Sequence, residues 1–335
     1  MEIGEKIMKD AILLFVFGLI LLIKGGDWFV DGATGIAKRF RIPDILIGAT
    51  VVSIGTTLPE VMVSATAAVG GQSAMAYGNA IGSVICNTAL IAAITIAIKP
   101  AEVERKTLII PVCFFFGAAI FYSIMAYALG EFPRWAGILL LTTFVVYMVM
   151  TVYKALTSPD RKPVILTPEE KEEESEEKTS LLKEIAFLVV GAALIAVGAD
   201  LLVDKGTYIA QAIGVPETVI SLTFVALGTS LPELVTAITS LIKGRGALSL
   251  GNLIGANLFN LVLVSGMAIT IAPFVVPVGN LIGGMNASLV LDIPVMFAVM
   301  GLLTLPTLIR GKLSKVQGYA LLGIYAVFIT LQFVL

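Results

Sequence analysis

The chain contains two copies of one segment, and each copy carries an acidic residue inside an apolar stretch. Residues 25–87 align with residues 198–260 at a constant offset of 173, and 24 of the 63 positions are identical. The copies share GTTLPE at residues 55–60 and GTSLPE at residues 228–233. An acid within a membrane span is costly and by default functional, and paired helix-breaking segments mark binding sites in duplicated membrane proteins. We therefore expect one ion site built from two half-sites.

Apolar runs long enough to cross a bilayer fill most of the chain. The sequence is 58% hydrophobic and 14% charged, whereas soluble domains are about 25% charged. About 20 apolar residues cross the roughly 30 Å of hydrocarbon in a membrane. Such runs lie at residues 10–37, 43–69, 74–98, 107–129, 133–155, 184–213, 216–242, 247–271, 286–309 and 316–335. The predicted fold is an all-α polytopic membrane protein with ten transmembrane helices.

The ten spans divide into two five-helix repeats, residues 1–155 and residues 184–335. Residues 156–183 form a polar connector between them, with an acidic run at residues 169–177. This composition is typical of a solvated and mostly disordered linker. A calcium-sensing role for the acidic run is disfavoured, because like charges without a folded cage bind the ion weakly.

Lysine and arginine are distributed unequally between the two sides of the predicted membrane. Loops after odd-numbered spans hold 17 of the 22. Because loops rich in Lys and Arg remain cytoplasmic, both termini are predicted outside and the linker inside, in a multi-pass protein of the plasma (inner) membrane. An odd number of spans per repeat then places the two repeats in opposite orientations.

The shared motif combines a proline, hydroxyls and a carboxylate. Pro59 and Pro232 fall mid-span, where each lacks an N–H donor and clashes with the carbonyl group four residues earlier. We expect the helix to open at both prolines and to expose carbonyl groups that a cation can satisfy. Thr56 lies four residues before Glu60, so hydroxyl and carboxylate share one helix face, and the second copy repeats this spacing.

A second set of polar side chains follows each motif on the next span. Asn79, Ser83 and Asn87 recur every four residues on one helix face, and the second copy has Asn252, Ala256 and Asn260 at the same register. Together with Thr57 and Ser230, these residues offer oxygen ligands, which suit hard cations such as Ca²⁺ and Na⁺. The chain has no histidine. For Asn79, Asn252 and the neighbouring glycines, simple helix packing is an equally good interpretation.

Other acids have structural interpretations. Asp27 and Asp31, like their copies Asp200 and Asp204, lie near span ends beside Lys24 and Lys205, which favours interface anchoring or local pairing over ion binding. Asp44 and Glu217 begin the next span of each copy, where helix N-termini favour an acid.

The two motifs, with the following GNAIGSVICN and GNLIGANLFN, resemble the two alpha-repeats of the sodium/calcium exchanger family within the cation/calcium antiporter superfamily. The resemblance spans most of the chain and is to prokaryotic members, which lack a large regulatory loop. It implies an inverted-repeat bundle around four cation sites near the midplane, with the first and sixth spans sliding to alternate access. The ligands it implies are Glu60, Glu233, Thr56, Thr57, Thr229, Ser230, Ser83, Asn87, Asn260 and the backbone carbonyls of Ser53 and Ala226.

Two positions depart from the family pattern. Ala256 stands where members often have serine, and Asn260 stands where some members, including potassium-dependent ones, have an acid. The pocket therefore carries the −2 charge of Glu60 and Glu233, which matches one Ca²⁺ or two Na⁺. These departures affect the expected number and affinity of Na⁺ ions and argue against potassium dependence.

The function expected from the sequence is secondary active exchange of Ca²⁺ for Na⁺ by alternating access, with both ions competing for one midplane site. The alternative is a Ca²⁺/H⁺ or other divalent cation/H⁺ antiporter, in which Glu60 and Glu233 are protonated instead. An enzyme is disfavoured because the chain offers no nucleophile with an adjacent base, and a passive channel because inverted halves suit alternation. We expect no cofactor and no nucleic-acid partner, only the transported ions and the lipid bilayer, and a monomer suffices.

Overall fold

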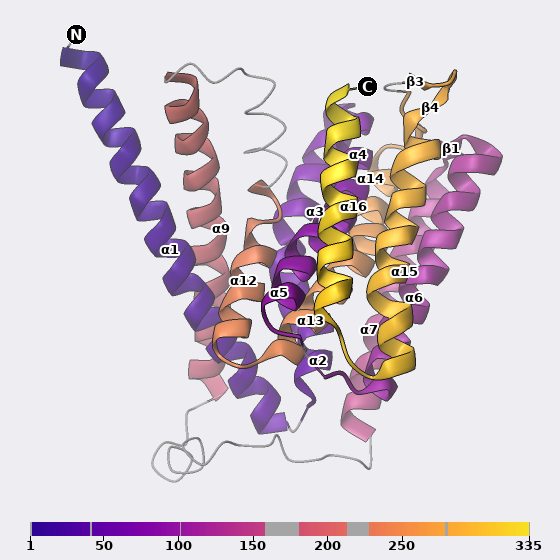
Figure 1. Ribbon diagram of the computed structural model, residues 1–335, viewed down its shortest axis with the longest axis horizontal. Helices are drawn as coiled ribbons and strands as arrows, with labels where there is room; N and C mark the ends of the chain where they lie inside the picture. The colour runs from indigo at the N-terminus through magenta and orange to yellow at the C-terminus, as the bar shows by residue number, and fades with distance from the viewer. Residues whose placement is uncertain are drawn as a thin grey trace.

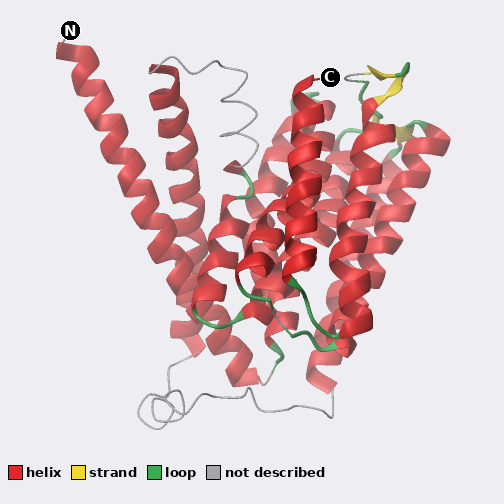
Figure 2. Ribbon diagram, viewed as in Figure 1, coloured by secondary structure: helices red, strands yellow, loops and turns green. Residues whose placement is uncertain are grey.

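The computed structural model describes residues 2–40, 42–100, 102–157, 181–212, 228–278 and 281–334. Helices make up nearly all of this part of the chain (Figure 2). The α-helices are α1 (Glu2–Phe40), α2 (Asp44–Ile47), α3 (Ser53–Val69), α4 (Ser73–Cys86), α5 (Ala93–Ile98), α6 (Arg105–Ile124), α7 (Arg134–Thr157), α9 (Leu181–Ala212), α12 (Leu231–Ile242), α13 (Gly246–Phe259), α14 (Ser265–Ile271), α15 (Ile293–Arg310) and α16 (Lys315–Val334). Wider π-helical turns continue several of them: η1 (Gly48–Val52), η2 (Asn87–Ala92), η3 (Met125–Leu129), η5 (Asn260–Val264) and η6 (Ser288–Asp292).

The helices form a bundle of long rods that run roughly side by side (Figure 1). α1 and α9 lie next to each other at one side of the bundle, and both chain ends lie at the same end of it. Within the described residues, seven helical stretches are long and apolar enough to cross a membrane: Asp44–Val69, Ser73–Ile98, Arg105–Leu129, Arg134–Lys154, Leu181–Gly206, Gly246–Ile271 and Ser288–Arg310. The molecule is therefore a helical, polytopic membrane protein.

The predicted number of ten spans is only partly tested. α1 and α16 occupy the positions of the first and last predicted spans. The seventh predicted span is described only from residue 228, and its second half forms the shorter apolar helix α12. Ten spans therefore stay a prediction, and Glu217 and most of the acidic linker lie outside the described residues.

The predicted opening of the helix at Pro59 is wrong. α3 continues from Ser53 to Val69 with this proline inside it. The irregular turn lies upstream, at η1, where the Tyr147 hydroxyl donates a 2.9 Å hydrogen bond to the carbonyl oxygen of Ala49. This turn ends at Val52, seven residues before the proline, and does not include Gly55, whose carbonyl group loses its usual donor. In the second copy, Pro232 lies in the first turn of α12, where a missing N–H costs little.

Glycines bring α1 and α9 into backbone contact. A Cβ atom added at Gly25 would lie 2.8 Å from the backbone nitrogen of Ile195, and one added at Gly198 would lie 2.8 Å from the carbonyl oxygen of Gly18. Contacts this short leave no room for a methyl group, so small residues set the separation of the two helices. Near one end of this interface Arg39 of α1 also pairs with Glu184 of α9, at 2.9 Å from Nε to Oε2.

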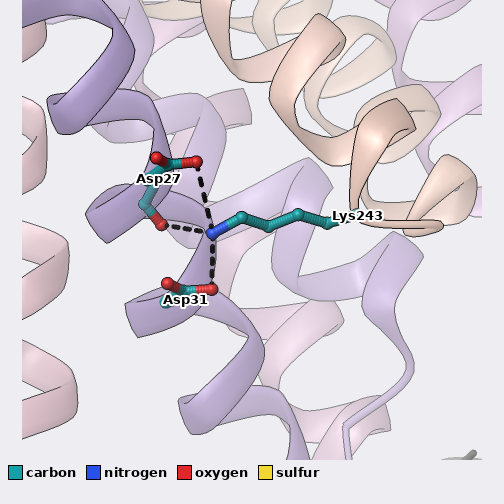
Figure 3. A network of polar contacts seen from close by, with 3 residues as sticks. All are labelled: Asp27, Asp31 and Lys243. Atoms are coloured by element: carbon teal, nitrogen blue, oxygen red, sulfur yellow. Dashed lines mark hydrogen bonds and ion pairs between the residues drawn. The ribbon is translucent and has the colours of Figure 1, made fainter.

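An ion-pair network joins α1 to the end of α12 (Figure 3). The Lys243 ammonium lies 2.7 Å from the Asp31 carboxylate and donates a 2.9 Å hydrogen bond to the carbonyl oxygen of Asp27. The predicted local pairing is found for Asp204 with Lys205, at 2.7 Å. For Asp27 and Asp31 the partner is instead Lys243, more than 200 residues away. The position equivalent to Lys243 in the first copy is Gly70, so this lysine is not repeated.

Two short pairings tie loops together at opposite ends of the bundle. At one end β1 (Glu131–Phe132) pairs antiparallel with β2 (Phe274–Val275). At the other end Glu102 pairs with Lys312, and the N–H of Val103 donates to the carbonyl oxygen of Gly311 at 2.9 Å. A third pairing, between β3 (Leu281–Ile282) and β4 (Met285–Asn286), closes a local hairpin. The first two pairings each join the first half of the chain to the second.

Candidate cation site

The two motif glutamates are fully buried in the helix bundle. Glu60 lies in α3 and Glu233 in the first turn of α12, and both side chains are 0% exposed. Among the described residues, none of their four carboxylate oxygens has a hydrogen-bond partner. The two carboxylates also lie within electrostatic range of each other. Buried charges in proteins are normally paired or bound to a metal ion, so this pair forms the centre of a candidate cation site.

Hydroxyl groups from both motifs are buried with the carboxylates. Thr57 is 0% exposed and Ser230 is 1% exposed, and neither hydroxyl has a partner within the part of the chain that the structure describes. The Thr56 hydroxyl donates a 3.1 Å hydrogen bond to the amide oxygen of Asn252. The Thr229 hydroxyl donates to the amide oxygen of Asn79 at 3.4 Å.

Asn87 and Asn260 occupy equivalent places after α4 and α13. Each residue begins a π-helical turn, η2 and η5 respectively. Both side chains are buried, and their amide oxygens and nitrogens lack partners in the described ranges. Wide turns of this type occur frequently at functional sites. The structure thus places two unsatisfied amide groups symmetrically with respect to the sequence repeat.

The remaining predicted site residues have mixed outcomes. Ser53 is buried at the junction of η1 and α3, and its hydroxyl lies 2.7 Å from the carbonyl oxygen of Gly48 and 2.9 Å from that of Asn252. Ser83 is buried on α4. Ala256, where a hydroxyl is missing, is 0% exposed on α13. Ala226 lies outside the described residues.

Asn79 and Asn252 have more specific contacts than helix packing requires. The amide nitrogen of Asn79 donates to the backbone oxygen of Glu60 at 3.2 Å and to the Ser64 hydroxyl at 2.9 Å. The sequence shows both asparagines at equivalent positions, but it does not show that each meets the threonine of the other copy. The sequence analysis named both asparagines as possible oxygen donors, but it missed these contacts.

A further polar group supports α13 beside the site. The amide nitrogen of Asn257 donates to the Thr88 hydroxyl at 2.7 Å and lies 3.2 Å from the sulfur of Met300. Thr88 immediately follows Asn87 in η2, so this hydrogen bond fixes η2 against α13. The positions equivalent to Asn257 and Thr88 in the other copy are Val84 and Leu261. Because these residues are apolar, the repeat does not indicate this hydrogen bond.

An apolar cavity of about 830 Å³ lies between α3, α9 and α12. Leu58, Pro59 and Met62 line it from α3, and Thr229 and Pro232 line it from the second motif. Neither Glu60 nor Glu233 lines this cavity. Thr229 and Asp200 are the polar residues in its lining.

The donor chemistry of the site fits hard cations. Two carboxylates, hydroxyl groups and amide oxygens are ligands that Ca²⁺ and Na⁺ prefer. The buried carboxylate oxygens and the Thr57 and Ser230 hydroxyls lack protein partners among the described residues. An ion bound between the two motifs would satisfy them.

Comparison with known proteins identifies the family. The model of the family described as sodium/calcium exchanger protein matches residues 10–153 and 183–334. The chain belongs to the sodium/calcium exchanger family. The resemblance carried by the two motifs is thereby confirmed.

Relatives match this family member over nearly their whole length. A putative antiporter, CaxA of Alkalimonas amylolytica, is 36% identical and aligns over 92% of this chain and 93% of its own. The sodium/calcium exchanger MaX1 of Methanosarcina acetivorans is 28% identical, with 96% and 98% covered. A solved structure of the sodium-calcium exchanger NCX_Mj, soaked with Na⁺ and Sr²⁺, is 30% identical, covers 96% of this chain and 99% of its own, and gives a TM-score of 0.79.

Membership in this family fixes the broad class of activity. The related proteins are membrane exchangers and antiporters, not enzymes. The fold of NCX_Mj extends over almost all of the chain. The protein is thus a membrane antiporter of the sodium/calcium exchanger family.

Proposed function

We propose that this antiporter exchanges Ca²⁺ for Na⁺ across the membrane by alternating access. The observation that carries the proposal is the burial of Glu60 and Glu233 without hydrogen-bond partners among the described residues. Two such carboxylates match the charge of one Ca²⁺ or of two Na⁺. The name of the related NCX_Mj and the Sr²⁺ used in its crystals support a divalent substrate.

The proposed ligand set is that implied by the family resemblance. Carboxylate oxygens come from the two glutamates. The proposed hydroxyl, amide and backbone ligands are Thr56, Thr57, Thr229, Ser230, Ser83, Asn87, Asn260 and the carbonyl groups of Ser53 and Ala226. Ions that share these ligands near the midplane cannot bind together, and this competition couples the two fluxes. A bare −2 charge in low dielectric is costly, so the pocket moves only when it is filled.

We infer an inverted-repeat architecture, with residues 1–155 and 184–335 as two five-helix halves and an acidic linker at 156–183. The loop pairings support it. β1 joins the loop after the fourth predicted span to the loop after the eighth, while Glu102 and Lys312 join the loops after the third and ninth. Exchanging the repeats converts one pairing into the other, and the two lie at opposite ends of the bundle (Figure 1).

The proposed orientation places both termini outside and the linker in the cytoplasm, in the plasma (inner) membrane. Both chain ends lie at one end of the bundle, as an even number of spans requires. Lys38 and Arg39 lie in the last turn of α1, and Lys243 and Arg245 lie between α12 and α13, at the opposite end of the bundle (Figure 1). This distribution agrees with the positive-inside rule. One chain supplies both half-sites, so a monomer is sufficient for transport.

Proton coupling is the second candidate function, because the same observation also favours it. A buried carboxylate without a partner can be neutralised by a proton as well as by Na⁺. The hydroxyl groups of Thr57 and Ser230 favour Na⁺, because a proton on a carboxylate needs no additional oxygen ligands. The two candidates predict different driving gradients.

The experiment that tests the proposal is ⁴⁵Ca²⁺ uptake into proteoliposomes. Vesicles loaded with Na⁺ are compared with vesicles loaded with choline and given only a pH gradient. Glu60→Gln and Glu233→Gln are measured alongside, because each keeps the side-chain shape and removes one charge.

We expect uptake that depends on the Na⁺ gradient and is abolished by either substitution. Uptake driven by the pH gradient alone would replace Na⁺ coupling by proton coupling. Flux that ignores both gradients would point to a channel and reject the antiport mechanism.

A further inference from the structure

Two of the hydrogen bonds that cross between the sequence copies are exchanged by the repeat. Thr56 of the first copy donates to Asn252 of the second, and Thr229 of the second donates to Asn79 of the first. The offset of 173 residues converts one pair into the other. The same contact is therefore made twice, once from each half.

The acceptor of a threonine's hydroxyl hydrogen determines whether its oxygen lone pairs can face a cation. A hydroxyl has one hydrogen to donate and two lone pairs to accept with. Several other threonines in the bundle donate to the carbonyl group of the preceding turn, as Thr50 does to Leu46 at 2.7 Å. Thr56 and Thr229 instead direct the hydrogen to an amide oxygen of the other copy, which leaves their lone pairs free.

A stronger acceptor lies close to Thr56. The Glu233 carboxylate is within interaction range of its hydroxyl, and hydrogen bonds to an ionised acceptor are roughly twice as strong as those to a neutral one. A hydroxyl that donates to the carboxylate would occupy an oxygen intended for a cation and point its hydrogen at that cation. The Asn252 amide oxygen provides the competing acceptor.

Hydrogen bonds hold the Asn79 amide with its oxygen directed at the Thr229 hydroxyl. Its nitrogen donates to the backbone oxygen of Glu60 and to the Ser64 hydroxyl. Both partners accept from nitrogen, and the amide oxygen therefore faces Thr229.

We propose that Asn79 and Asn252 are positioning residues for cation binding. Their amide oxygens accept the hydrogens of Thr229 and Thr56, so that the threonine lone pairs face the transported cation. The inference rests on the proposed function for the threonines as ligands. It adds two residues that act on the ion only through their partners.

Double-mutant cycles test this assignment. Thr56→Val and Asn252→Leu form one within-pair cycle, and Thr229→Val and Asn79→Leu form the other. The matched control is the cross-pair cycle of Thr56→Val with Asn79→Leu. The readouts are the Na⁺ concentration for half-maximal ⁴⁵Ca²⁺ uptake, the maximal uptake rate, and the shift in melting temperature caused by Na⁺ or Ca²⁺.

We expect each single substitution to raise the half-maximal Na⁺ concentration about tenfold, the loss of one hydrogen bond. Within a pair, the double variant should resemble the single variants. Across pairs, the effects should multiply to about a hundredfold.

The proposal would be overturned if the effects of two substitutions on the half-maximal Na⁺ concentration multiplied within a pair as they do across pairs. Asparagine variants that melt earlier in choline and bind Na⁺ and Ca²⁺ unchanged would also overturn it, because that pattern indicates packing alone. If Na⁺ has no effect on the unmodified protein, the proposed Na⁺ coupling is wrong. The same double-mutant cycles, measured by the shift in melting temperature that Ca²⁺ causes, then test the positioning role by themselves. Where an Asn→Leu variant does not fold, Asn→Ala replaces it.

Discussion

The Thr56 hydroxyl donates a hydrogen bond to the amide oxygen of Asn252, 196 positions later in the chain. The Asn252 amide nitrogen, by contrast, is buried and has no partner among the described residues. Its counterpart on Asn79 donates to Ser64, and the residue equivalent to Ser64 is Ala237. The two halves thus differ around this amide, and one of the differences is the hydroxyl that position 237 lacks.

Supplying that hydroxyl should stabilise the protein. Ala237→Ser places a hydroxyl where Ser64 lies in the first copy, and a buried hydrogen bond contributes about 1 kcal/mol. We expect a higher melting temperature in detergent for Ala237→Ser and a lower one for Ser64→Ala. A fall in melting temperature for Ala237→Ser would show that the equivalence of the two positions does not extend to this contact.

The α1–α9 interface should not tolerate a methyl group. Gly25→Ala places a Cβ 2.8 Å from the backbone nitrogen of Ile195, and overpacking of this kind costs about 1–3 kcal/mol. Gly323→Ala in α16 is the control, since a Cβ there meets no described heavy atom within 4 Å. Thermal melts should separate the two variants, with the control unchanged or slightly more stable. Equal melting temperatures would contradict backbone contact between α1 and α9.

Removal of the Lys243 side chain should loosen the attachment of α1 to α12. The three charged groups are partly exposed, so the loss in overall stability should be below about 1 kcal/mol. Hydrogen exchange should nevertheless become faster in the backbone amides that follow Asp27. Lys205→Ala is the control, because its ammonium pairs with Asp204 on α9. The same exchange rates in both variants would argue against a local attachment.

Restoring a hydroxyl at Ala256 should strengthen Na⁺ binding in the proposed site. Ala256→Ser adds one oxygen ligand on the face of α13 that carries Asn252 and Asn260, and we expect the half-maximal Na⁺ concentration to fall about threefold. Ala268→Ser, buried in α14, controls for the introduction of a hydroxyl into the bundle. An unchanged Na⁺ dependence would mean that position 256 does not face the ion.

The sequence was sufficient to single out the two buried glutamates of the candidate site, but not the hydrogen bonds around them. Glu60 and Glu233 were predicted because an acid in an apolar stretch is costly wherever it occurs, and the structure buries both. The hydrogen bonds of Asn79 and Asn252 depend on which helices of the two copies meet. Periodicity within a single span carries no information about that.

Pro59 shows a different limit of sequence reasoning. Proline chemistry predicts a lost backbone hydrogen bond, but it does not decide whether the helix opens there. The structure keeps α3 continuous and places the wide turn at η1. The turn there receives a hydrogen bond from Tyr147, on α7, and no local rule anticipates that contact.

Lys243 makes the two halves of the chain unequal. Its ion pairs with α1 have no equivalent in the first copy, where the sequence has Gly70. In the proposed cycle α1 and α9 move together, and Lys243 attaches α1 to the end of α12. We expect the two proposed open states to differ in this contact, because the repeat does not duplicate it. One lysine thus makes a duplicated chain asymmetric.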